Sequence, residues 1–158
     1  MISRRAFVIR ATGIVAAGTA ASRLAGQLPR GGSAVTPITI YKSSTCGCCT
    51  KWVEHVRAAG FVPTVFDEED MDSIKDKLRV PAPVRSCHTA VVANYLIEGH
   101  VPASDIRRLL AEKPGFAGLA VPGMPPGTPG MVPSGTAPAG FEVVGFQHDG
   151  TTRTFARY

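Results

Sequence analysis

The sequence lacks the features of a nucleic-acid-binding protein. Aromatic residues make up only 7% of the chain, and no stripe of basic residues is interleaved with them. Five of the 17 basic residues lie in the first 30 residues, which leaves 12 basic against 12 acidic residues in the remainder. Because that remainder is formally neutral, the net charge of +5 does not indicate binding to nucleic acid.

The N-terminal segment also lacks an apolar run long enough for a comfortable membrane span. Residues 11–21 are rich in Ala and Gly and poor in Leu and Ile. They follow a twin-arginine pattern at residues 3–8 (SRRAFV) and precede small residues suited to cleavage at a point after Gly18. We therefore predict an export signal and linker over residues 1–30, periplasmic localisation, and no stable membrane span after cleavage. An uncleaved anchor remains open as an alternative.

Cysteine is scarce but clustered. Of the four cysteines, Cys46, Cys48 and Cys49 fall within four residues, and Cys87 is followed directly by His88. Three crowded thiols are too many for one simple disulfide, so we predict that they are redox-active, metal-bound or both. Thiolates are soft ligands that favour Cu(I), Zn(II) and iron–sulfur clusters. In an oxidising compartment such thiols risk scrambled disulfides unless a metal or a reducing partner protects them.

The residues after the export segment are sufficient for one small α/β domain over residues 31–158. Hydrophobic periodicity predicts strands at residues 38–42, 61–66, 89–93 and 95–98, and helices at residues 48–59, from Met71 to Leu78, and from Pro102. The order β-α-β-α-β-β-α is that of a thioredoxin-like fold. A Gly/Pro-rich loop over residues 121–140 and a β-hairpin of residues 141–146 and 151–156 complete the predicted domain.

Two local details of the helices are also predicted. Ser44 or Thr45 can cap the first helix, because hydroxyl side chains accept hydrogen bonds from the free N–H groups of the first turn. Met71, Ile74 and Leu78 share one face of the second, short helix.

The predicted strand order brings the distant cysteine to the cluster. In a thioredoxin-like fold the thiol motif lies between the first strand and the first helix, and the loop before the third strand returns across it. That loop is residues 84–88 here. We therefore expect Cys87 to lie against the Cys46–Cys49 loop, so that four thiols converge. The N-terminus of the first helix favours the thiolate forms of Cys48 and Cys49.

Further donors lie near this predicted site. His88 follows Cys87 directly, and if both were in strand geometry their side chains would point to opposite faces, so the two could share one metal site only if the chain bends there. His100 ends a predicted strand and could turn back toward the thiols. Met124 and Met131 lie in a Gly/Pro-rich loop with little core to fill, and thioether sulfur is a Cu(I) ligand. For each of these residues a packing or surface role remains the alternative.

Four linked motifs give the chain a resemblance to a known family. They are residues 45–49 (TCGCC), 86–90 (SCHTA), 98–102 (EGHVP) and 123–131, which begin with GMP and end with GM. In this order and spacing they resemble the exported metal-binding family that includes the copper-resistance protein CopG. The resemblance covers residues 36–131. Val132 departs from it, because an acidic residue is expected there.

The resemblance implies a thioredoxin-like fold and a role in copper handling. It assigns metal binding to Cys46, Cys48, Cys49 and Cys87, and less directly to the methionines and histidines named above. In some members the copper is thought to form a multinuclear, redox-active cluster. The resemblance gives little help with residues 132–158, whose hairpin could extend the sheet or cover the site.

Three functions are therefore compared. The first is an exported copper-binding protein of resistance or homeostasis, cycling Cu(I) and Cu(II) and exchanging copper with other exported copper-handling proteins. The second is a thiol–disulfide oxidoreductase that uses Cys46 and Cys49, which keep the Cys-x-x-Cys spacing. The third is a structural zinc module, which the clustered Cys-x-Cys-Cys pattern fits less well. Whether the protein turns over as a copper oxidoreductase stays open. We also predict that the methionine loop folds over the thiols and places the Met124 sulfur near them.

Overall fold

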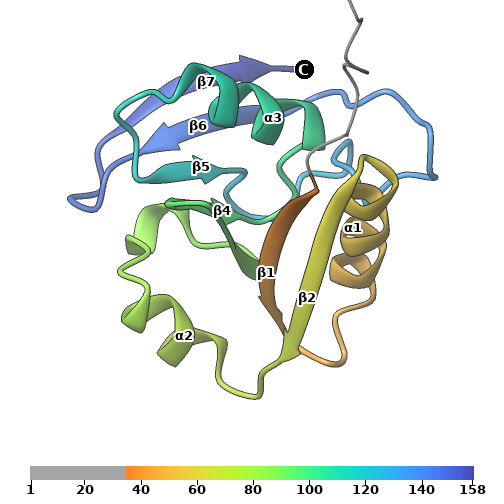
Figure 1. Cartoon of the computed structure of the whole chain (residues 1–158), viewed down its shortest axis with the longest axis horizontal. Helices are drawn as coiled ribbons and strands as arrows, with labels where there is room; N and C mark the ends of the chain where they lie inside the picture. Colours follow the sequence, from red (N-terminus) through yellow and green to blue (C-terminus); the bar gives the residue numbers. More distant parts are fainter. Residues whose placement is uncertain (1–34) are drawn as a thin grey trace, which may run out of the picture. The chain divides into compact units, whose positions relative to one another are not determined.

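Seven strands form one mixed sheet in the computed structural model, which describes residues 35–158 (Figure 1). The strand order is β2-β1-β3-β4-β5-β6-β7. The strands are β1 (Thr36–Lys42), β2 (Phe61–Asp67), β3 (His88–Val92), β4 (Tyr95–Glu98), β5 (Gly118–Ala120), β6 (Glu142–Phe146) and β7 (Thr152–Arg157). The helices are α1 (Gly47–Ala58), α2 (Met71–Lys77) and α3 (Ala103–Glu112), and a 3₁₀ turn, η1, spans Ala82–Val84. The predicted export signal lies outside the described residues.

The first unit of the fold, β1-α1-β2, follows the predicted pattern. Alternate residues of β1, Ile38 and Ile40, are buried in the core together with Trp52 and Val53 of α1. Gly60 has a φ of +90° after the end of α1, a left-handed conformation that glycine adopts without steric cost. The chain then enters β2, which pairs in parallel with β1.

The second helix forms where it was predicted, but its most buried residue is not an apolar one. The buried residue of α2 is Lys75, whereas Met71, Ile74 and Leu78 are only partly buried. The apolar spacing therefore identified the helix but not its innermost side chain. The reason is a tertiary one, because the Lys75 amine reaches a buried carboxylate, Glu98 of β4, that the helical pattern does not reveal.

Strand β5 was not predicted from the sequence. It has only three residues, pairs in parallel with β4, and pairs antiparallel with β6. Its first residue must be small, because a Cβ atom at Gly118 would lie 2.0 Å from the Leu96 carbonyl oxygen. A strand of this length is too short to show an alternation of apolar and polar residues, so it can be recognised only from its pairing with neighbouring strands.

The predicted C-terminal hairpin is confirmed. Strands β6 and β7 pair antiparallel beyond β5, with an irregularity in register between Val143 and Val144. The hairpin therefore extends the sheet at the end opposite β2 (Figure 1). None of the helices in residues 35–158 has the length and hydrophobicity needed to cross a membrane.

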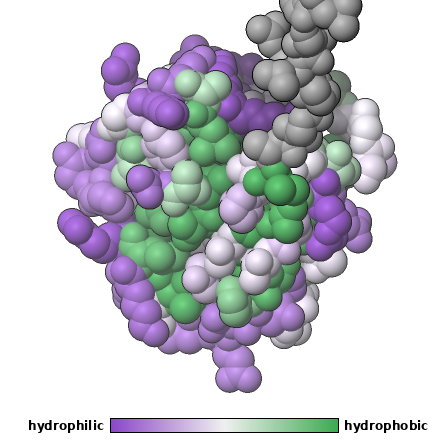
Figure 2. Space-filling model, in the orientation of Figure 1, coloured by the Kyte–Doolittle hydropathy of each residue, from purple (hydrophilic) through white to green (hydrophobic). Residues whose placement is uncertain are grey.

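The sheet separates two apolar clusters. The larger contains the buried side chains of α1 and α3 with alternate residues of the central strands, including Ile97 and Leu119. The smaller contains the neighbouring residues Leu96 and Ala120, packed with Phe146 and the segment after α2. Successive strand residues point to opposite faces, so α1 and α3 cover one face and the segment after α2 covers part of the other. Figure 2 shows apolar residues gathered in the middle of one face of the molecule, with hydrophilic residues around its rim.

Candidate metal centre

The cysteine loop lies between the end of β1 and the first turn of α1. Cys46 is the N-cap of α1, and its Sγ accepts a hydrogen bond from the backbone N–H of Cys49. The prediction that Ser44 or Thr45 caps this helix is therefore wrong. A turn in which the Cys46 N–H donates to the Ser43 carbonyl, at 3.1 Å, places the thiol rather than a hydroxyl at the cap position.

Two of the clustered cysteines form a disulfide. Cys46 and Cys49 are bonded to each other, and Cys48 and Cys87 are free and half-buried. The Cys48 sulfur lies 3.5 Å from that of Cys46. A site that used all four cysteines as thiolates would therefore require reduction of this disulfide.

The four cysteine sulfurs lie within 4.8 Å of one another. Cys87 reaches the group because β3 runs antiparallel to β1, with His88 in register with Lys42 at the end of β1. The loop before β3 thus meets the loop after β1 at one end of the sheet. The predicted convergence of the four thiols is confirmed.

A second donor group overlaps the first. One ligand atom from each of Cys49, Cys87, His88 and His100 lies within 4.8 Å of the others. In a regular strand Cys87 and His88 would point apart, but β3 begins only at His88 and the chain has the required bend at Cys87. That bend leaves the Cys87 Sγ 3.3 Å from the Nδ1 atom of His88.

Both histidine rings of this group are fully buried. The His88 ring packs between Trp52 and His100, with centroid separations of 4.3 and 5.2 Å. His100 Nδ1 lies 2.6 Å from the carbonyl oxygen of Pro129, so it donates there and leaves the lone pair on Nε2. The Nε2 atoms of His88 and His100 have no hydrogen-bond partner, which is uncommon for buried polar atoms.

The electrostatics favour neutral donors. Burial lowers the pKa of His88 well below its ordinary value, and the nearby His100 lowers it further. Burial also lowers the pKa of His100. Both imidazoles are therefore neutral at pH 7, the form that ligates metals. Burial, reinforced by nearby Cys48, raises the pKa of the Cys87 thiol to about 11, so a metal that binds this sulfur must displace a proton.

This donor set fits a soft metal ion. Four sulfur atoms and two buried imidazoles form two overlapping donor groups, and soft thiolates select Cu(I) or Zn(II) over hard cations. Two buried nitrogen atoms left without hydrogen bonds would each cost free energy unless another group occupied them. The arrangement can therefore hold a metal ion, and its two free thiols beside a disulfide can also support thiol–disulfide exchange.

Comparison with solved structures identifies the family. A structure of the copper resistance protein CopG, Form 2, is 41% identical in sequence, with a TM-score of 0.71, over 78% of this chain and 98% of that one. Form 1 of the same protein is 42% identical, with a TM-score of 0.70, over 77% of this chain and 96% of that one. The chain belongs to the CopG family. No curated protein matches its sequence.

The CopG family resemblance predicted from the four motifs is thus confirmed. A second comparison adds a shorter match. Residues 84–131 match the family described as "Protein of unknown function, DUF411". This match contains Cys87, both buried histidines and both loop methionines, but not the Cys46–Cys49 loop.

The methionine loop lies against the cysteine loop in this CopG-family chain. A Cβ atom at Gly130 would lie 2.8 Å from the Cys48 carbonyl oxygen, so the backbones approach closely there. Thr128 is fully buried, and the Pro129 carbonyl accepts the His100 hydrogen bond, which explains how a loop of few large side chains is held. The side chains of Met124 and Met131 are 57% and 40% exposed. Their role as ligands stays a prediction.

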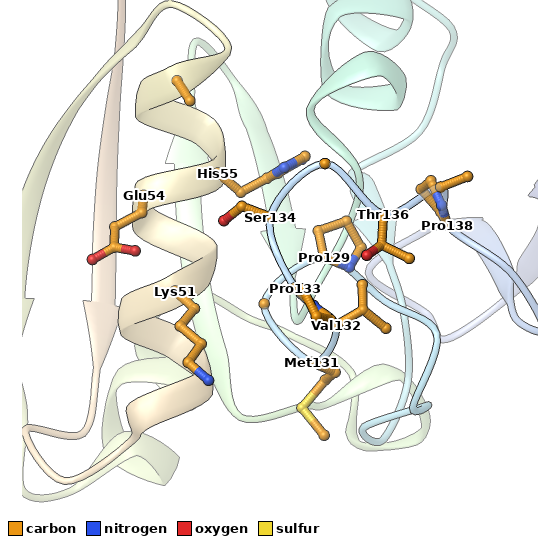
Figure 3. A pocket seen from close by; sticks show the side chains of 14 residues that line it. Lys51, Glu54, His55, Pro129, Met131, Val132, Pro133, Ser134, Thr136 and Pro138 are labelled. Carbon is orange, nitrogen blue, oxygen red and sulfur yellow. The ribbon is translucent and has the colours of Figure 1, made fainter.

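A cleft of about 980 Å³ lies between α1 and the chain that follows Thr128 (Figure 3). Lys51, Glu54 and His55 of α1 line one wall, and residues 129–138 line the other. In Figure 3 the His55 ring reaches toward the loop, whereas Glu54 points away from it. The cleft contains no cysteine, and Met131 is the residue it shares with the predicted donors.

Sequence reasoning missed two polar arrangements in segments next to the donors. His55 Nε2 accepts a hydrogen bond of 3.0 Å from the Ala103 N–H at the start of α3, where Pro102 offers no side-chain cap. Lys75 and Glu98 form a buried ion pair behind the Cys87 segment. The only signal for the first was a proline at the helix start, which leaves an N–H group in need of an acceptor. Nothing in the local pattern indicated the second.

Proposed function

We propose that this protein is an exported copper-binding protein that serves copper resistance or homeostasis. The observation that carries the proposal is the convergence of four cysteine sulfurs with two buried imidazoles whose Nε2 atoms lack partners. Its membership of the family of the copper resistance protein CopG supports copper as the metal. Other exported copper-handling proteins are the partners that such a role requires.

We further propose that the copper is Cu(I) and that more than one ion is bound. Sulfur-rich sites favour Cu(I) over harder ions. The two donor groups share Cys49 and Cys87 but differ in their other members, which supports two neighbouring metal positions bridged by shared sulfur. The exposed Met124 and Met131 sulfurs, on a loop next to Cys48, are proposed as additional thioether donors.

Redox cycling between Cu(I) and Cu(II) is the most specific part of this proposal. Thiolates stabilise Cu(I), whereas imidazole also suits Cu(II), so a mixed donor set can accommodate both oxidation states. His88 and His100 supply the imidazoles here. Electron paramagnetic resonance of the copper-loaded protein, before and after addition of a mild oxidant, tests this part because Cu(II) gives a signal and Cu(I) does not.

The cellular setting and the fold family are proposed together. A twin-arginine pattern in residues 3–8 supports export to the periplasm. The order β1-α1-β2-α2-β3-β4-α3, with β1 and β2 parallel and β3 and β4 antiparallel, supports a thioredoxin-like unit extended by β5, β6 and β7. Immunodetection in periplasmic and cytoplasmic fractions, with Arg4→Lys combined with Arg5→Lys as the export-deficient control, tests the location.

The decisive experiment is a competition titration of the reduced protein with Cu(I) and Zn(II). We expect Cu(I) to bind far more tightly and Cys48→Ser to lower the number of copper ions bound. Thr45→Ala, which alters an exposed side chain next to the cluster, is the matched control. Equal or stronger retention of zinc would refute copper handling as the main function.

A thiol–disulfide oxidoreductase is the second candidate, favoured by the Cys46–Cys49 disulfide at the start of α1. A free thiol, Cys48, lies 3.5 Å from Cys46 and can take part in exchange. If Cys48→Ser leaves metal binding intact and abolishes reduction of a disulfide substrate, this second function replaces the first.

A further inference from the structure

A buried ion pair lies directly behind the Cys87 segment. Lys75 of α2 and Glu98 of β4 are 3% and 0% exposed, and the Lys75 amine pairs with Glu98 Oε1. The same amine donates to the Thr89 hydroxyl at 2.9 Å. Burying two charges costs desolvation free energy, and well-packed apolar residues often stabilise such a position equally well. Stability alone therefore does not explain the pair.

The Glu98 carboxylate holds both sides of the Cys87-His88 pair. Its Oε1 atom accepts the backbone N–H of Ser86 at 2.6 Å, and its Oε2 atom accepts the Thr89 hydroxyl at 2.7 Å. Ser86 precedes Cys87, and Thr89 follows His88. One side chain thus fixes the residues on either side of the bend that turns Cys87 Sγ toward His88 and the other thiols.

Glu98 also lies where this segment crosses the one that carries His100. The Gly99 N–H donates to the His88 carbonyl at 3.0 Å. Gly99 has a φ of +70°, and a Cβ atom there would lie 2.4 Å from the Ser86 hydroxyl. The two segments are therefore in close backbone contact, and a shift of Ser86 would displace Cys87, His88 and His100 together.

We propose that Glu98, held in place by Lys75, is a positioning residue of the metal centre. Its carboxylate fixes the bend at Cys87, so that the donors of β3 and β4 meet the thiols of the Cys46–Cys49 loop. Residues that orient metal ligands from behind typically change metal affinity by about 10- to 100-fold when they are replaced. The test of this role by Cu(I) affinity rests on the proposed function, whereas a second test, by the alkylation rate of Cys87, does not.

The test compares two double variants that both remove the ion pair. Lys75→Met with Glu98→Gln keeps an amide oxygen to accept the Ser86 N–H and an amide nitrogen to donate to Thr89. Lys75→Met with Glu98→Leu has similar volume but no polar group. We expect the Gln variant to bind Cu(I) within about threefold of the original chain and the Leu variant to bind about tenfold or more weakly. Cu(I)–thiolate absorption should change only in the Leu variant.

The second measurement uses reduced, metal-free protein and follows alkylation of Cys87 by iodoacetamide with mass spectrometry. We expect the rate to rise about fivefold in the Leu variant, as the bend loosens, and to stay unchanged in the Gln variant. If the original chain binds no Cu(I), the proposed function fails, while the alkylation rates still test positioning. The positioning role would be overturned if both variants kept the copper affinity and the Cys87 alkylation rate of the original chain. It would also be overturned if the Gln and Leu variants lost copper affinity to the same extent.

If the Leu variant does not fold, Thr89→Val carries the same test, because it removes the hydrogen bond from Thr89 to Glu98, together with that from Lys75 to Thr89, and preserves side-chain shape. A faster alkylation of Cys87, with unchanged far-ultraviolet circular dichroism, supports the proposal. An unchanged rate in the folded Thr89→Val protein overturns it.

Discussion

The strands β1, β3 and β4 lead to the cysteine and histidine donors, whereas β5, β6 and β7 carry none of them. The donor end has buried polar groups in addition to its apolar core, above all Lys75 and Glu98. The opposite end is held by apolar and aromatic packing, in which Phe146 is fully buried and Arg108 lies 3.7 Å from the centre of the Phe155 ring. The two ends of one sheet are therefore stabilised by different kinds of interaction.

This difference predicts a division of roles along the sheet. Apolar packing is largely non-directional, so it stabilises the fold without requiring particular atoms to face one another. Hydrogen bonds and ion pairs are directional, so they can hold ligand atoms in defined positions. We expect changes at the β5–β7 end to alter stability with little effect on metal binding, and changes at the donor end to do the reverse.

The largest expected effect is at the apolar end. Phe146→Ala removes a fully buried ring from the cluster with Val80 and Val84, and should lower the free energy of unfolding by about 3–5 kcal/mol. Urea unfolding followed by circular dichroism measures this change. Under conditions where the variant is folded, Cu(I) binding should match that of the original chain. A loss of copper affinity in folded protein would break the division between the two ends.

The next effect concerns the donor end. Cys87→Ser removes the free sulfur that both donor groups share, and should weaken Cu(I) binding by about 100-fold, equivalent to about 2.7 kcal/mol. The change is nearly isosteric, so the free energy of unfolding of metal-free protein should change by less than about 1 kcal/mol. Competition with a Cu(I) chelator measures the change in copper affinity, and urea unfolding measures the change in the free energy of unfolding. A large loss of stability without a loss of affinity would assign Cys87 to the core.

The pH dependence of the unfolding free energy provides a second test of the environment of Cys87. Burial raises the Cys87 pKa from 9.0 to about 11, so the folded protein holds the thiol proton more strongly than the unfolded chain. The resulting stabilisation is complete below pH 9 and is lost as the pH rises through about 11. Because the thiol is partly exposed, we expect about 1–2 kcal/mol. The unfolding free energies of the original chain and of Cys87→Ser are measured, both metal-free and with the disulfide intact. Their difference is followed from about pH 8 to about pH 11.5, roughly the span of this titration. A difference that does not change with pH would contradict the predicted shift.

The smallest effect is at the C-terminus. Tyr158 donates a hydrogen bond of 2.7 Å to Asp105 of α3 and stacks on Phe141. Tyr158→Phe keeps the ring and removes the donor, so it should lower the free energy of unfolding by about 1 kcal/mol. Thermal unfolding measures the loss, and Cu(I) binding should remain unchanged. An altered copper affinity here would show that the two ends of the sheet are coupled.

Much of the fold could be predicted from periodicity. The apolar alternation around Ile38 and the helical spacing of Val53 and Val56 identified β1 and α1 within two residues. Strand β5 could not be found, since three residues carry no period and the strand exists only through its pairing with β4 and β6. The burial of Lys75 in α2 could not be predicted, because its partner Glu98 is distant in sequence.

The candidate site, like the fold, could be predicted only in part. The four thiols were placed together because the order of elements alone brings the loop before β3 to the loop after β1. The bend needed to bring Cys87 and His88 into one site could be named from the sequence, but only the structure shows that the chain bends at Cys87. The helix cap was misassigned because the turn at Ser43 sets which residue occupies that position, and propensity alone ranks hydroxyls above thiols.

The sequence by itself determined the chemical character of this protein: three thiols within one turn of chain, a fourth thiol next to a histidine, and the motifs that mark the CopG family. Only the tertiary structure decided which of these atoms face one another and which nitrogen atoms lack partners. It also decided that Glu98 secures the Cys87 bend. The physical reason is that donor types are local properties of residues, whereas distances, burial and hydrogen-bond partners depend on strand register and on contacts between segments far apart in the chain.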